Sequence, residues 1–145
     1  MRPSGLTWPL LGLVGLLAAR RWLDVVEVRG RSMGPVLLPG DRLLVVRAPP
    51  RLGDVVIAPD PRAPSRELIK RVAAIDRAGV HLRGDNPLAS TDARTFGAVP
   101  RADVRWRAAL RYWPIDRIGP IPPAGHHDEG GEAACAFPEA LVAGD

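Results

Sequence analysis

Glycine and proline recur so often in this chain that its central part shows no long helical period. The 145 residues include 15 glycines and 16 prolines, and a proline inside a helix costs about 3 kcal/mol because it removes a hydrogen bond and clashes with the preceding turn. Between these breaks lie short apolar or alternating runs, which are typical of β-strands. The runs cover residues 25–29, 42–47, 54–58, 68–75, 80–83 and 104–112. The sequence therefore predicts a mainly β fold, a compact barrel or sandwich.

The N-terminus differs from the rest of the chain, because residues 6–19 are almost wholly apolar. Trp8, near the start of this segment, and Trp22, after its end, are placed like the interfacial tryptophans of membrane helices, although a spanning helix needs roughly 20 residues. We expect a single-pass membrane anchor over residues 1–24, in contact with membrane lipid. A removable signal peptide is the alternative. More arginines follow the segment than precede it, and that count favours a cytoplasmic position for the next domain.

The composition divides the remainder into a β domain at residues 25–118 and a tail at residues 119–145. The tail is rich in proline, glycine and acidic residues, so we expect it to be disordered. His126-His127 lack a third ligand at a usable spacing, and the single cysteine, Cys135, allows neither an intramolecular disulfide nor a CxxC metal pair. We expect no metal and no other cofactor.

The charge of the chain does not by itself indicate a nucleic-acid partner. The net charge is +4 and the isoelectric point is about 10.5. The arginines are spread along the sequence, without a basic block interleaved with aromatic residues. We therefore expect no nucleic acid among the partners.

One lysine stands among 20 basic residues, and all the others are arginine. Lys70 lies in an alternating run where its side chain can point inward, and a buried lysine can lose its proton whereas arginine cannot. Among the few serines, Ser32 follows a strand in a glycine-flanked turn, which can expose a hydroxyl together with free backbone N–H groups. His81, the only histidine of the β domain, has the pattern of a surface strand residue. The sequence thus favours a Ser32–Lys70 dyad over a histidine triad.

Four stretches between about residue 25 and residue 115 resemble, in the same order, the sequence boxes of type I signal peptidases. These are membrane-anchored Ser-Lys proteases, and the compact members such as the mitochondrial inner-membrane peptidases are the most similar. The stretches are Gly30-Arg31-Ser32-Met33-Gly34-Pro35, Gly40-Asp41-Arg42-Leu43-Leu44-Val45, Ile69-Lys70-Arg71-Val72, and Gly84-Asp85-Asn86-Pro87 with its continuation to Arg94. The resemblance implies a compact signal-peptidase-like β fold with an N-terminal membrane helix.

The resemblance also implies roles for individual residues. Ser32 would be the nucleophile, with its own backbone N–H in the oxyanion hole, and Lys70 would be the general base. Ser90 would orient the lysine, and Asp92 and Arg94 would form a structural ion pair. One departure concerns the position two residues before the nucleophile, where many members carry a hydroxyl that stabilises the oxyanion and this chain has glycine.

The implied activity is cleavage of signal or leader peptides from precursor proteins after small residues, at a membrane. The family favours an extracytoplasmic catalytic domain. One alternative keeps the chemistry but takes the leader of nickel superoxide dismutase as substrate. Another is a self-cleaving domain of the SOS-repressor type, which fits less well because no helix-turn-helix precedes it. A third, from a different class, is a membrane-tethered β-domain that binds peptides without cutting them.

Overall fold

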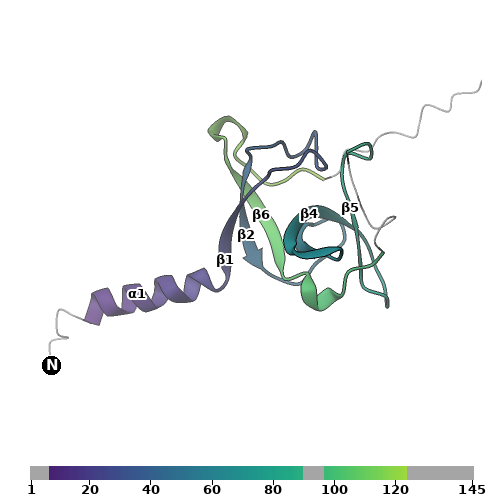
Figure 1. The fold of residues 1–145 in the computed structure, drawn as a ribbon. Coiled ribbons are helices and arrows are strands. Elements are labelled where there is room, and N and C mark those ends of the chain that lie inside the picture. The colour runs from purple at the N-terminus through teal and green to yellow at the C-terminus, as the bar shows by residue number, and fades with distance from the viewer. Residues whose placement is uncertain (1–6, 90–96, 124–145) are drawn as a thin grey trace, which may run out of the picture.

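The computed structural model describes residues 7–89 and 97–123 and is mainly β (Figure 1). One sheet of antiparallel strands has the order β1-β2-β6-β3-β4-β5. The elements in chain order are α1 (Thr7–Arg20), β1 (Leu23–Glu27), β2 (Arg42–Arg47), β3 (Val55–Asp60), β4 (Ala63–Ile75), β5 (Val80–Arg83), the short 3₁₀ helix η1 (Arg101–Asp103), β6 (Trp106–Trp113) and the 3₁₀ helix η2 (Ile115–Arg117). The mainly β prediction is confirmed.

The sheet is strongly curved but open, which corrects the expectation of a barrel or sandwich (Figure 1). Strand β1 pairs only with β2, and β5 pairs with β4 only from Arg71 onward. The first half of β4, from Ala63 to Lys70, therefore pairs on one edge alone, with β3. Within the described residues, no strand joins β1 to this half of β4, so the sheet does not close.

The first half of β4 is also where the predicted strand boundaries were wrong. The sequence run was expected to begin at residue 68, whereas the strand begins at Ala63. Pro64 and the polar residues that follow it gave no strand pattern, because they have no alternating buried face. A proline is tolerated in a strand only where its edge is unpaired. This half forms a wall of the cleft described below.

Two clusters of buried side chains hold the sheet together. One joins the loop after β1 to β2 and β3 through residues such as Met33, Leu37 and Leu43, all at most 1 % exposed. The other joins β3, β4 and β5, with Val72 and Leu82 at its centre. Since each fully buried side chain of this size contributes about 1.5–3 kcal/mol, the first cluster fixes the loop that contains Ser32.

Helix α1 projects from the start of β1, away from the sheet, and all its side chains are exposed (Figure 1). It has 14 residues, a length of about 21 Å at 1.5 Å per residue. No helix in the part of the chain that the structure describes is long and apolar enough to cross a membrane. The prediction of a single-pass helix over residues 1–24 is therefore not supported.

The segment after β6 has defined contacts as far as Pro122, whose carbonyl accepts a hydrogen bond from Arg71. Gly119 exchanges two backbone hydrogen bonds with Arg111, and Ile121 packs against the first core cluster. His126, His127 and Cys135 lie outside the described residues, so the division into anchor, β domain and tail stays a prediction.

Candidate active site

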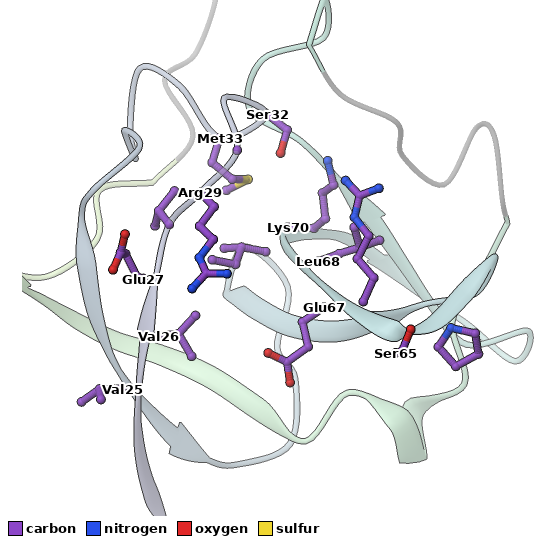
Figure 2. Close-up of a pocket in the computed structure, with 15 residues that line it drawn as sticks. Val25, Val26, Glu27, Arg29, Ser32, Met33, Ser65, Glu67, Leu68 and Lys70 are labelled. Atoms are coloured by element: carbon purple, nitrogen blue, oxygen red, sulfur yellow. The ribbon is translucent and has the colours of Figure 1, made fainter.

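A cleft of about 760 Å³ lies between the two unpaired edges of the sheet (Figure 2). One wall is β1 with the turn that follows it, and the other is the first half of β4. The lining residues are Val25, Val26, Glu27, Val28, Arg29, Gly30, Ser32, Met33, Pro64, Ser65, Arg66, Glu67, Leu68, Ile69 and Lys70. The cleft has the size of a site for a small molecule or a short peptide segment.

Ser32 lies in the turn at the end of the first wall, and neighbouring contacts fix its backbone. The next residue, Met33, is 1 % exposed in the core, so the turn cannot move independently of the sheet. From the segment that follows β5, the backbone N–H of Asn86 donates to the carbonyl of Ser32 at 2.9 Å, and the Asn86 amide donates to the carbonyl of Arg31 at 3.4 Å. The Ser32 side chain is half-buried and faces the cleft.

Lys70 lies on the opposite wall, and β4 holds it in a buried position. Its backbone is in register with Val56 of β3, and the residue is 3 % exposed. Figure 2 shows the amine of Lys70 and the hydroxyl of Ser32 at the same end of the cleft, turned toward each other. The fold therefore brings to one site two of the residues that the sequence singled out, although 37 residues of chain separate them.

The backbone N–H of Ser32 donates no hydrogen bond to any residue that the structure describes. This donor and the Ser32 hydroxyl belong to the same turn. A Cβ built on Gly30 meets no atom within 4 Å, so the position that lacks a hydroxyl in this chain is also open space. The turn can thus supply one main-chain hydrogen-bond donor to a negatively charged oxygen, and the open space at Gly30 leaves room for a second donor.

A buried ion pair lies directly behind Lys70. Arg71 binds both carboxylate oxygens of Asp85, at 2.8 and 2.7 Å, and the two side chains are only 8 % and 7 % exposed. The same guanidinium donates to the carbonyls of Gly53 and Pro122. Asp85 directly precedes Asn86, whose backbone N–H binds the Ser32 carbonyl. The Arg71–Asp85 pair therefore links β4, which carries Lys70, to the turn that contains Ser32.

A second charged cluster holds the far side of the Ser32 loop. Asp41, 2 % exposed, accepts hydrogen bonds from Arg111 at 3.3 Å and Arg117 at 3.0 Å. Both arginines also donate to the carbonyl of Val36. The sequence identified Asp41 only as part of a motif, and the partners that satisfy it come from β6 and η2, about 70 residues away.

Of the other candidates, the structure describes only His81, and it lies away from the cleft. His81 bonds Asp76 at 2.8 Å, in the turn between β4 and β5, and is not among the residues that line the cleft. Ser90, Asp92 and Arg94 lie outside the described residues. Among those that are described, no cluster of three or more His, Cys, Asp or Glu side chains could hold a metal ion.

Sequence analysis missed four residues that line the cleft. The sequence patterns did not single out Arg29, Ser65, Arg66 or Glu67. The first half of β4 carries three of them, and its polar composition gave no strand signal. Their position became visible only when this half was found opposite β1.

Comparison with known proteins relates the chain to membrane peptidases. The family model described as "Signal peptidase, peptidase S26" matches residues 4–81. The mitochondrial ATP-independent inner membrane protease subunit 1a of Arabidopsis thaliana is 32 % identical over 127 residues, covering 68 % of this chain and 76 % of the relative. The mitochondrial inner membrane protease subunit 1 of Xenopus tropicalis is 32 % identical over 123 residues, with 68 % and 74 % covered. Signal peptidase I of Leptolyngbya laminosa is 42 % identical over 40 residues, which are 28 % of this chain and 20 % of that protein.

Proposed function

Because the chain belongs to the signal peptidase family, peptidase S26, we propose that it is a serine endopeptidase that acts on precursor proteins, with Ser32 as nucleophile and Lys70 as general base. The observation that carries the proposal is that the buried side chain of the only lysine and the hydroxyl of Ser32 face each other at one end of the cleft (Figure 2). Burial disfavours the charged form of a lysine, and a neutral amine can accept a proton.

The proposed reaction proceeds through an acyl-enzyme. Lys70 Nζ takes the proton of the Ser32 hydroxyl while Oγ attacks the scissile carbonyl carbon, and the backbone N–H of Ser32 stabilises the oxyanion. The proton then passes to the leaving amine as the peptide bond breaks. Water gives a proton to the same lysine and attacks the ester carbon, the bond to Ser32 Oγ breaks, and the lysine returns the proton to Oγ as the acid product leaves. Ser90 as the residue that orients the lysine, and the Asp92–Arg94 ion pair, remain parts of this proposal.

The open sheet gives the substrate a place to bind. The outer edge of β1 and the edge of β4 from Ala63 to Lys70 both lack a pairing strand among the described residues, and the cleft lies between them. An extended peptide can add to such edges by main-chain hydrogen bonds. We therefore expect the precursor to bind as a strand, with a small side chain beside Ser32, close to the buried apolar Met33 and Val28 that line the same part of the cleft.

Association with a membrane is part of the same proposal. The Arabidopsis and Xenopus relatives are inner membrane proteases by name. Helix α1 exposes Trp8, Leu11 and Val14 among other large apolar side chains, each more than half exposed. Apolar surface of this kind is favourably buried in lipid. Flotation of the protein with lipid vesicles, with and without α1, would test this part.

The decisive experiment measures cleavage of a precursor-derived peptide in detergent. Ser32→Ala and Lys70→Arg are both expected to abolish cleavage while far-UV circular dichroism remains that of the parent. Ser65→Ala is the matched control, because it removes another hydroxyl from the same cleft and should leave the rate within about twofold. Substantial processing by either dyad variant would refute the proposed mechanism.

A second candidate function is peptide binding without cleavage. The specific observation in its favour is Gly30, which removes the hydroxyl that many members place in the oxyanion hole. The loss of one such donor costs about 10²–10³ in turnover. Tight peptide binding by the parent protein, with no product formed over hours, would favour this candidate.

A further inference from the structure

The cleft contains charged side chains that the proposed chemistry does not use. Besides Lys70, its lining includes Glu27, Arg29, Arg66 and Glu67. None of these four forms an ion pair or a side-chain hydrogen bond with any residue that the structure describes. Their charges are therefore available to a bound molecule.

Two of these side chains, of opposite charge, face the interior of the cleft from opposite walls. Figure 2 shows Arg29 and Glu67 extending into the space between the walls, whereas Glu27 is turned to the outer side of its strand. Arg29 precedes Ser32 by three residues, and Glu67 precedes Lys70 by three. Three residues span at most about 11 Å, so the backbone of each charged residue lies within that distance of the proposed reacting residue on its own wall.

An apolar segment would bind poorly beside these two charges. Covering Arg29 and Glu67 with apolar side chains would remove water from both groups without providing partners, which is unfavourable unless both side chains rotate back into solvent. A segment with complementary charges would instead form two charge-assisted hydrogen bonds and keep both side chains in place.

We propose that Arg29 and Glu67 form a charge-selective subsite, which rests on the proposed peptidase function. The subsite favours precursor segments that carry an acidic and a basic side chain within a few residues of the scissile bond. The acidic side chain binds Arg29 and the basic one binds Glu67. The substrate class is thus a polar leader with mixed charge rather than a uniformly apolar one.

The first test measures binding, so that it does not depend on turnover. The full chain with Ser32→Ala, in detergent, is titrated with four fluorescent peptides that share one small-residue cleavage sequence and are neutral, acidic, basic or doubly charged beside it. The doubly charged peptide should bind about tenfold more tightly than the neutral one, which corresponds to 1.4 kcal/mol. Adding Arg29→Glu should reverse the preference between the acidic and the neutral peptide, and adding Glu67→Lys should do so between the basic and the neutral one.

Glu27→Lys is the matched control, because it reverses a charge on the same wall that does not face the cleft interior. It should leave the order of the four affinities unchanged. Equal dissociation constants for all four peptides, or equal effects of Glu27→Lys and Arg29→Glu, would overturn the subsite.

The same peptides, offered to the chain with Ser32 intact, separate the two proposals. Charge-dependent binding without cleavage of any peptide would leave the subsite standing and refute the peptidase function. Cleavage of all four peptides with equal kcat/KM would support the peptidase function and refute the charge-selective subsite.

Discussion

Removal of Asp85 should destabilise the fold far more than removal of a surface carboxylate. In Asp85→Ala the guanidinium of Arg71 stays in a site where its side chain is 8 % exposed, and it loses the two hydrogen bonds and the negative charge that balance it. Only the carbonyls of Gly53 and Pro122 remain as acceptors. Breaking a buried pair in this way costs about 3–5 kcal/mol.

Urea denaturation followed by circular dichroism measures this loss. With a denaturant dependence of about 2 kcal/mol per molar, the midpoint should fall by roughly 2 M. Asp54→Asn is the control, because it removes the charge from an ion pair with Arg107 that is 3.4 Å long and about a quarter exposed, while its amide oxygen can still accept the hydrogen bond from the backbone N–H of Arg51. This change should cost about 1 kcal/mol or less. The double variant Asp85→Ala with Arg71→Met should recover part of the stability, because no unpaired charge remains. A loss of about 1 kcal/mol or less for Asp85→Ala would refute the argument.

Two further predictions concern the oxyanion site and the hairpin turn. Gly30→Ser should raise kcat for peptide cleavage by about tenfold or more without loss of stability. The new Cβ enters open space, and the new hydroxyl can act as an added donor to the oxyanion. An unchanged or lower kcat would count against the proposed site. Asp76 has a pKa below its usual value of about 3.9, first because of its hydrogen bond with His81 and then because of the backbone N–H of Ala78. The ionised Asp76 should therefore stabilise the fold above about pH 4, and this contribution should be lost as the pH falls through its lowered pKa. The difference in urea midpoint between the parent and Asp76→Asn should accordingly shrink in acid. A difference that does not change between about pH 3 and pH 7 would contradict this.

The mainly β class could be predicted from the sequence because it depends on local chemistry, and the same local patterns singled out Ser32 and Lys70, which both line the cleft. Turn residues and apolar runs marked most strands, and a single lysine among arginines marked Lys70. The prediction of a barrel or sandwich was wrong in this detail, because whether β1 pairs with β4 depends on the curvature of the whole sheet, which no local sequence pattern reports. The single-pass helix was expected from apolar composition, but α1 has 14 residues.

By itself, then, the sequence singled out two candidate reacting groups: a serine in a glycine-flanked turn, and the one lysine among the basic residues. Only the tertiary structure decided what surrounds them. It placed the polar start of β4 opposite β1, brought Arg29 and Glu67 into one cleft, and joined Arg71 to Asp85, 14 residues away, and to Pro122, 51 residues away. The physical reason is that strand pairing and burial act between segments distant in the chain, so the partner of a charge is set by the fold and not by its neighbours in sequence.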